Sequence, residues 1–245
     1  MLHKDPFLIK PETFDLIQRL QSLDFLVDFY LVGGTALALQ IGHRNSIDID
    51  LFSRETFNSN QFIGQLQAKF TLEVTFEATN TLLTFIEHIK VDFITHNYPL
   101  INPPKEEEGI RFLSLPDIAA MKLNAISNSG KRLKDFIDIY FLLEHFSMSE
   151  MIEFYTIKYP NFNPLIALRA VSYFDDIDPS VDPPKLPVKL SLEKIKKRIS
   201  QSVLHSKCGY CGRSNYPFNN CQFANRITVT PWWAEGTLSL RNSEV

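Results

Sequence analysis

The stretch GGTALALQIGHRNSIDIDLF, residues 33–52, decides the fold. Its two glycines follow DFYLV, residues 28–32, a short aromatic and β-branched run, and they precede the helix-forming run TALALQ. This order predicts a strand, a tight turn and a helix. After HRNS, residues 43–46, the run IDIDLF alternates apolar and acidic residues with the period of a strand. The stretch is therefore typical of the start of an α/β domain.

The two acidic residues of this run, Asp48 and Asp50, predict a metal site. Positions two apart in a strand face the same side, so we expect the two carboxylates to project together. Ile47, Ile49 and Leu51 would then face the opposite side. Two neighbouring carboxylates repel each other, and a divalent cation that prefers oxygen ligands relieves the repulsion. The alternative is an edge strand with a solvated acidic face.

A third carboxylate, Asp92, stands in the short apolar run KVDFIT, residues 90–95. A buried Asp needs a partner. If this strand lies beside the IDIDLF strand, three carboxylates meet, as a site for two Mg²⁺ ions requires, with Mn²⁺ as a substitute. One ion would activate an attacking hydroxyl and the other would steady a triphosphate. The alternative is that Asp92 pairs with Lys90 or Lys122.

Gly33, Gly34 and Thr35 predict a turn that binds phosphate. Glycines let the backbone approach a phosphate closely, and the start of the following helix offers N–H groups and a favourable dipole. The Thr35 hydroxyl would add one more donor. Any tight connection could use two glycines, however, and no Walker sequence follows them.

The remaining chain predicts a mixed or antiparallel sheet followed by helices. Helical spacing of apolar residues covers 11–23 and 58–69, and strands are expected at 71–78 and 81–89. The run NPPKEEEG, residues 102–109, predicts a solvated loop and a domain boundary. Beyond it, Ser114 is expected to cap a helix, and three more helices are expected near 135–146, 149–158 and 163–173. A linker at 175–190 and a basic helix at 191–199 would follow, without regular structure after Ser200.

The composition narrows the class of protein. The chain has 245 residues, 44% hydrophobic and 22% charged, as in an ordinary soluble globular protein. A net charge of -3 argues against coating nucleic acid by bulk charge, but it allows local basic patches. No apolar stretch is long enough for a bilayer, and MLHKDPFLIKPETF lacks the apolar core of a signal peptide. With 3 cysteines as well, we expect a cytoplasmic protein without membrane contact.

The stretch from residue 33 to residue 52 resembles the first motif of the DNA polymerase β-like nucleotidyltransferase superfamily: Gly-Gly or Gly-Ser, a short helix, then Asp-x-Asp. More narrowly, it resembles the AbiEii/AbiGii family of toxin nucleotidyltransferases, in which an arginine and a serine, here Arg44 and Ser46, precede the acidic pair. The resemblance continues in KVDFI around Asp92 and in SLPDIAAMKLNAISNSGKRLKDFIDIYFLL, residues 114–143. It covers roughly residues 30 to 145.

The resemblance implies a polymerase β-like α/β core with a mixed sheet at 1–101, a helical domain at 110–200 that completes the nucleotide cleft, and an atypical tail at 201–245. It implies Mg²⁺-dependent transfer of a nucleoside monophosphate from a nucleoside triphosphate to a hydroxyl, with the tRNA 3′ end as acceptor. The biological role would be the toxin of a type IV-like toxin–antitoxin or phage-defence pair, with a separate antitoxin as partner. An aminoglycoside-like small-molecule acceptor and a non-catalytic binding module are the alternatives.

The residues that the resemblance assigns fall into two groups. Asp48, Asp50 and Asp92 would bind the metal ions and carry catalysis. The residues that would bind the nucleotide are Gly33, Gly34, Thr35, Arg44, Ser46, Lys122, Lys134, Asp135 and Asp138. Asp135 and Asp138 could instead pair with Lys131 or Lys134 on one helix face.

Two further sets of residues suggest ligands. Basic clusters at 131–134 and 194–198 suit the phosphates of a tRNA acceptor stem, or are solvated helix faces. A tetrahedral zinc site needs four ligands, and the tail supplies one candidate set. This set consists of His205, Cys208, Cys211 and Cys221. The alternative is an appended chain end without such a role.

Overall fold

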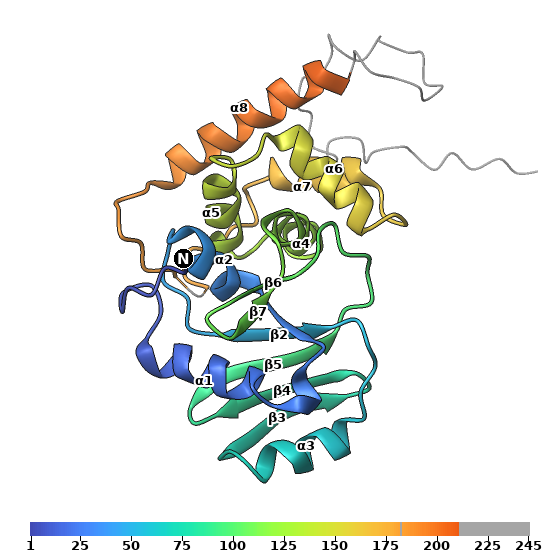
Figure 1. Cartoon of the computed structure of the whole chain (residues 1–245). Helices are drawn as coiled ribbons and strands as arrows, with labels where there is room; N and C mark the ends of the chain where they lie inside the picture. Colours follow the sequence, from blue (N-terminus) through green and yellow to red (C-terminus); the bar gives the residue numbers. More distant parts are fainter. Residues whose placement is uncertain (182, 211–245) are drawn as a thin grey trace, which may run out of the picture. The chain divides into compact units, whose positions relative to one another are not determined.

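The computed structural model describes residues 1–181 and 183–210 (Figure 1). Its strands form a mixed seven-stranded sheet in the order β3-β4-β5-β2-β1-β7-β6. The strands are β1 (Phe29–Val32), β2 (Ile49–Ser53), β3 (Leu72–Ala78), β4 (Thr81–Ile86), β5 (Ile89–Thr95), β6 (Lys105–Glu107) and β7 (Ile110–Phe112). The α/β class with a mixed sheet that the sequence predicts is confirmed.

Strand β2 lies near the middle of the sheet and positions the acidic residues. It runs antiparallel to β1 and parallel to β5. Asp50 of β2 is in register with Asp92 of β5. Because equivalent positions of two paired strands face the same side of a sheet, the two carboxylates share one face. The prediction that the Asp92 strand lies beside the IDIDLF strand is therefore confirmed.

Helices cover the sheet and continue beyond it. They are α1 (Pro11–Gln21), α2 (Gly33–Ile41), α3 (Ser59–Gln67), α4 (Leu115–Asn128), α5 (Leu133–Leu142), α6 (Met148–Lys158), α7 (Pro164–Val171) and α8 (Leu192–Tyr210), with a short 3₁₀ turn at Asp24–Leu26. Ser114 accepts a hydrogen bond from the backbone N–H of Asp117, so the predicted cap of α4 is confirmed. Helix α4 packs against α5, α6 and α7.

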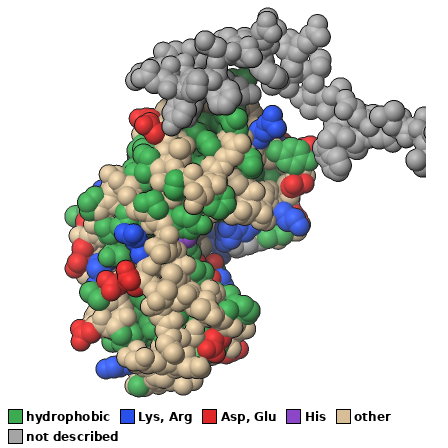
Figure 2. Space-filling view, turned by 90° about the vertical axis from the view of Figure 1, so that its right-hand side faces the viewer, with side chains coloured by type: hydrophobic (Ala, Val, Ile, Leu, Met, Phe, Trp, Pro, Cys, Tyr) green, Lys and Arg blue, Asp and Glu red, His purple; other side chains and the backbone are tan. Residues whose placement is uncertain are grey.

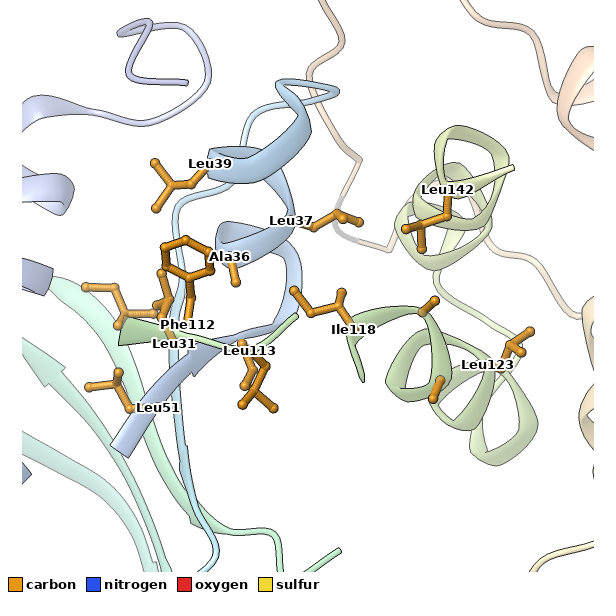
Figure 3. Packing of buried hydrophobic residues seen from close by; sticks show 14 of the residues in the cluster. Leu31, Ala36, Leu37, Leu39, Leu51, Phe112, Leu113, Ile118, Leu123 and Leu142 are labelled. Atoms are coloured by element: carbon orange, nitrogen blue, oxygen red, sulfur yellow. The ribbon is translucent and has the colours of Figure 1, made fainter. Parts of the chain in front are cut away.

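Helix α2 is buried on opposite sides, which fixes its first turn in space. Figure 3 shows Ala36 and Leu39 on the side of Leu31 and Phe112, while Leu37 faces Ile118 of α4. Each side chain in this layer is at most 3% exposed. A fully buried leucine contributes about 1.5–3 kcal/mol, so this packing holds the Gly33–Gly34 end firmly against the sheet.

The structure corrects the prediction of a solvated loop at 102–109. Residues 105–107 form β6, which pairs with β7, and β7 extends the sheet beyond β1. The connecting residues Glu108 and Gly109 have φ of 54° and 74°, as the favoured two-residue hairpin turns require. The charged run Lys-Glu-Glu suits an edge strand, because charged side chains on an edge discourage pairing with other chains.

Two more predictions about local structure are wrong. Strand β2 begins at Ile49, so Asp48 precedes it, and Ile47 is 52% exposed instead of facing the core. Helix α8 continues past Ser200 to Tyr210, because Ile195, Ile199 and Val203 keep a buried face along it.

Residues Met1–Lys207 pack as one compact unit. The division into parts at 1–101 and 110–200 stays a prediction. In the described part of the chain, no helix is long and apolar enough to cross a membrane.

Candidate active site

A cavity of about 320 Å³ lies where β2, β5, the start of α2 and helix α4 come together. Figure 2 shows basic, acidic and histidine side chains gathered in a hollow on one face of the molecule. The predicted site residues that line the cavity are Gly33, Gly34, Arg44, Ser46, Asp48, Asp50, Asp92, Lys122 and Lys134. Thr35, Asp135 and Asp138 lie behind the cavity wall, where they are at most 1% exposed. Residues from distant parts of the sequence therefore meet in one place.

Asp50 and Asp92 form the acidic centre of this cavity. Burial, and next the charge of Asp92, raise the pKa of Asp50 above its ordinary value. One oxygen of Asp92, Oδ2, accepts a hydrogen bond of 2.7 Å from Lys90 Nζ. The other, Oδ1, is buried and has no hydrogen-bond partner among the residues that the structure describes. A buried carboxylate oxygen without a partner is costly, so this pair is suited to receive a cation or a proton.

Gly33 and Gly34 make room for the side chains of the site. Gly33 has a φ of 69°, and a Cβ there would overlap the carboxylate of Asp50. A Cβ at Gly34 would overlap the guanidinium of Arg44. The two glycines thus let Asp50 and Arg44 lie directly against the first turn of α2. The N–H groups of that turn, unpaired within the helix, can bind an anion.

Thr35 supports the acidic loop from behind. Its hydroxyl donates to the backbone carbonyl of Asp48 and lies 2.9 Å from the hydroxyl of Ser46. This hydroxyl therefore makes its hydrogen bonds inside the protein, whereas the sequence suggested that it would donate to a phosphate. The Asp48 side chain is 32% exposed, and its Oδ2 lies 3.9 Å from Lys134 Nζ. Asp48 thus stands at the mouth of the cavity, beside a cation.

Asp138 is the centre of a buried charge network that holds the basic side chains of the cavity. It accepts hydrogen bonds from Arg44 Nε at 2.6 Å and Arg44 Nη2 at 3.0 Å, and it lies 2.7 Å from both Lys122 Nζ and His43 Nε2. Burial opposes ionisation, but Arg44, Lys122 and His43 together hold the pKa of Asp138 well below its usual value. Asp138 is therefore a fixed negative charge.

Asp135 completes the network. It accepts from Lys122 Nζ and from Arg132 Nε, each at 2.9 Å. Burial lowers the pKa of Lys122, but the charges of Asp135 and Asp138 outweigh it and raise the pKa. Arg44, Lys122 and Arg132 all line the cavity, so the three cations outnumber the two carboxylates that hold them. Asp135 binds Lys122 and Arg132, and Asp138 binds Arg44 and Lys122, so both carboxylates orient cations that lie outside α5.

The acidic residues provide hard oxygen ligands of the kind that Mg²⁺ prefers. The unpartnered Oδ1 of Asp92 and the raised pKa of Asp50 fit a site that gains from a cation. Within the described residues, no group of three or more His, Cys, Asp or Glu side chains is already arranged as a metal site. Asp50 and Asp92 are placed together by strand register, whereas metal binding by all three carboxylates stays a prediction.

A second cavity of about 590 Å³ adjoins the first and shares part of its wall. The shared residues are Arg44, Ser46, Asp48, Lys90 and Lys134. The second cavity adds Lys10 and Lys185, two cations that sequence reasoning did not identify. The sequence offers no reason to choose these two lysines, because they lie far from every motif. A backbone hydrogen bond from the N–H of Asn45 to the carbonyl of Lys185 brings the segment around Lys185 to the site. Lys90, by contrast, stands two residues before Asp92 and so on the same strand face.

Other predicted residues lie away from both cavities or outside the described residues. The basic residues at 194–198 line neither cavity, and Arg198 pairs with Glu144 at 3.1 Å. The zinc prediction falls largely outside the described side chains, since it depends on Cys208, Cys211 and Cys221. Of that set, His205 is described, and its Nδ1 lies 2.6 Å from the carbonyl of Gln201.

Comparisons with known proteins identify relatives of the chain. The model of the nucleotidyl transferase AbiEii toxin family, of the type IV toxin–antitoxin system, matches residues 15–183. An uncharacterized protein of Aquifex aeolicus (strain VF5), aq_aa25, is 33% identical over 174 residues, which cover 69% of this chain and 84% of that protein. A provisionally assigned nucleotidyltransferase from H. pylori has a similar fold, with a TM-score of 0.53 and 16% identity over 83% of this chain and 99% of its own. JHP933 from Helicobacter pylori matches with a TM-score of 0.46, 15% identity, and coverage of 82% and 93%.

Proposed function

The chain belongs to the AbiEii family of nucleotidyl transferase toxins of type IV toxin–antitoxin systems, and we propose that it transfers a nucleoside monophosphate to the 3′ hydroxyl of tRNA. It is a nucleotidyltransferase by this membership. The metal dependence, the acceptor and the roles of individual residues belong to the proposal. Its antitoxin, implied by the family, would be a separate protein that binds this chain.

One observation carries the proposal: Asp50 and Asp92 are in register on adjacent strands, against the start of α2, in a cavity rich in cations. The carboxylates can bind cations, and the N–H groups at the start of α2 can bind anions. A triphosphate needs cationic and N–H groups, and a divalent ion needs carboxylates. Both sets are present in one cavity, which is the combination that nucleotidyl transfer requires.

The residues of the chain would share the reaction as follows. The N–H groups of the first turn of α2, with Arg44, Lys122 and Lys134, would bind the triphosphate. Mg²⁺, or Mn²⁺, held by Asp50, Asp92 and Asp48, would neutralise the phosphates and lower the pKa of the acceptor hydroxyl.

The transfer itself makes one bond and breaks one. The acceptor oxygen would form a bond with the α-phosphorus, and the bond from that phosphorus to the bridging oxygen would break, releasing pyrophosphate. Asp92, through its unpartnered Oδ1, is proposed to receive the hydroxyl proton. Positioning and charge stabilisation would supply most of the rate.

The second cavity supports a polyanionic acceptor. Among the residues that the structure describes, its wall carries Lys10, Arg44, Lys90, Lys134 and Lys185 against the carboxylates of Glu12 and Asp48. Since it adjoins Asp48, an RNA end in it would reach the acidic centre while the phosphates of the strand meet the lysines. An aminoglycoside is itself a cation and would favour an acidic pocket, so this wall disfavours a small-molecule acceptor of that class.

The acceptor can be tested with a matched substrate pair. The purified chain is incubated with Mg²⁺, each labelled nucleoside triphosphate, and total tRNA, either intact or oxidised by periodate to destroy the 3′ diol. Label on intact tRNA alone would support the proposal. Equal labelling of oxidised tRNA, or transfer to aminoglycosides with none to tRNA, would contradict it.

A further inference from the structure

One part of the wall of the first cavity, the aromatic end, carries aromatic and apolar side chains. It is formed by Phe52 of β2, His96 just after β5, Tyr159 just after α6, and Ile118 and Met121 of α4. The rings of Phe52 and His96 lie 5.5 Å apart at 35°, and those of His96 and Tyr159 lie 5.8 Å apart at 85°. The proposed binding of phosphate and metal uses none of these side chains, so the aromatic end needs another explanation.

The strand periodicity places this aromatic end at a useful distance from the acidic centre. Phe52 follows Asp50 by two residues on β2, and His96 follows Asp92 by four residues along the chain, so both continue the acidic face of the sheet. At about 3.3 Å per residue, Phe52 lies ~7 Å beyond Asp50. That separation leaves room for a sugar between a phosphate at the acidic centre and a ring against Phe52.

Hydrogen bonds hold the wall in position before any ligand binds. The backbone N–H of His96 donates to the carbonyl of Ser53 at 2.7 Å, which ties it to the end of β2. Its Nε2 lies 3.2 Å from the hydroxyl of Tyr159, a residue only 1% exposed. Burial, together with the charge of Lys158, lowers the pKa of His96 to about 4. At neutral pH the ring is therefore uncharged and able to stack on another ring.

A second polar atom of the cavity, besides Oδ1 of Asp92, lacks a hydrogen-bond partner among the described residues. Asn124 of α4 lines the cavity, and its buried Oδ1 has no hydrogen-bond partner in the part of the chain that the structure describes. A buried amide oxygen without a partner costs free energy, which a ligand donor would recover. The amide carries both donors and an acceptor, the set that can distinguish the hydrogen-bonding edges of nucleobases.

From these observations we infer that the aromatic end is the nucleobase site for the incoming nucleoside triphosphate, with Phe52 and His96 as the stacking surface and Asn124 as the residue that selects the base. This inference rests on the proposed function, since it assigns the base end of the same substrate. Stacking on aromatic side chains accepts any base, because every base has a π-face. We therefore assign discrimination between bases to Asn124, since a buried polar group left unpaired penalises the wrong base.

The site can be located without relying on transfer. The full chain is photo-crosslinked with 8-azido-ATP and with 4-thio-UTP, whose reactive groups are on the base, and the crosslinked peptides are mapped by mass spectrometry. We expect crosslinks on the peptides that contain Phe52, His96 or Asn124, and competition by an excess of unmodified nucleotide. Crosslinks on the second cavity, at Phe7 or Phe85, would overturn the inference, and so would an absence of competed crosslinks.

Substitutions test the roles of the two kinds of residue. Phe52→Leu keeps an apolar side chain but removes the π-face, and we expect a rise of about tenfold in KM for every nucleoside triphosphate. Asn124→Ala is expected to reduce the ratio of kcat/KM between the preferred and the second nucleotide by about tenfold or more. The matched controls are Phe76→Leu, an exposed phenylalanine of β3, and Asn128→Ala, one turn further along α4; neither lines the cavity. Unchanged preference in Asn124→Ala, in a protein that unfolds at the wild-type temperature, would overturn the selecting role.

The base site and the proposed tRNA acceptor can be refuted independently. Crosslinks at the aromatic end without any transfer to tRNA would leave the base site standing and refute the proposed acceptor. Transfer to tRNA with crosslinks elsewhere would support the proposed function and refute the base site.

Discussion

Replacing Asp138 with Asn is the sharpest test of how the basic side chains of the cavity are held. The substitution keeps the shape of the side chain and removes its charge. Asp138 is fully buried and receives Arg44 at 2.6 Å and Lys122 at 2.7 Å. In the variant, Lys122 keeps its ion pair with Asp135 at 2.9 Å.

The size of the effect follows from burial. Removing one partner of a buried ion pair costs about 3–5 kcal/mol, because the other charge is left uncompensated. For a protein of this size, about 1 kcal/mol corresponds to a shift in Tm of about 2–4 °C, so we expect Tm to fall by about 6–20 °C. The direction in which this stabilisation changes with pH is also defined. The pKa of Asp138 is lowered in the folded state, so its stabilisation is complete above the ordinary value of 3.8 and declines as pH falls below it.

The assay is urea and thermal unfolding at pH 7 and at decreasing pH, with Glu144→Gln as the control. Glu144 pairs with Arg198 at 3.1 Å but is 51% exposed, and loss of an exposed pair costs less than about 1 kcal/mol. We expect the difference between wild type and Asp138→Asn to narrow at acidic pH. A loss in Asp138→Asn no larger than in Glu144→Gln would refute the reasoning about the buried network.

Three further predictions concern the acidic centre and the acceptor. Gly33→Ala should lower the free energy of unfolding by about 1–2 kcal/mol and abolish transfer, because a φ of 69° disfavours a side chain and the new Cβ would displace Asp50. The control is Gly64→Ala, where a Cβ meets nothing within 4 Å; it should leave transfer intact and slightly raise Tm. Asp50→Asn should raise the Tm of the metal-free protein at pH 7, since burial raises the pKa of Asp50 and its ionised form destabilises the fold; in EDTA the gain should vanish below the unfolded-state pKa of about 4, and a lower Tm at pH 7 would contradict this. Lys185→Glu should raise KM for tRNA several-fold and leave KM for the nucleotide unchanged, whereas Lys189→Glu, outside the second cavity, should change neither; equal effects in an electrophoretic binding assay would contradict a specific acceptor surface.

The acidic centre could be predicted from sequence because its signals are local. The alternation in IDIDLF and the apolar surroundings of Asp92 specify strands, and pairing of those strands places Asp50 and Asp92 together. The edge hairpin of β6 and β7 escaped prediction because its composition is that of a loop, and pairing with β1 decides its structure.

The support behind the site could not be predicted in the same way. The sequence names Arg44 and Asp138 but does not show that they bond each other across 94 positions of the chain. The sequence places a hydroxyl at Thr35, but it does not show that this hydroxyl donates a hydrogen bond to the backbone carbonyl of Asp48. The aromatic end of the cavity was missed because Tyr159 reaches it from just after α6, and only tertiary packing reveals that contact.

The carboxylates of Asp50 and Asp92 are central to the proposed transfer, and one measurement tests the role of Asp92 directly. Transfer of labelled nucleotide to tRNA is followed over time for wild type, Asp92→Asn and Asp175→Asn, an exposed aspartate outside both cavities, with Mg²⁺ and with EDTA. With Mg²⁺, we expect the transfer rate of Asp175→Asn to match that of wild type and the rate of Asp92→Asn to be lower by at least about a hundredfold. In EDTA, we expect no transfer by any of the three proteins. Wild-type rates in folded Asp92→Asn, or full activity in EDTA, would contradict the central claim.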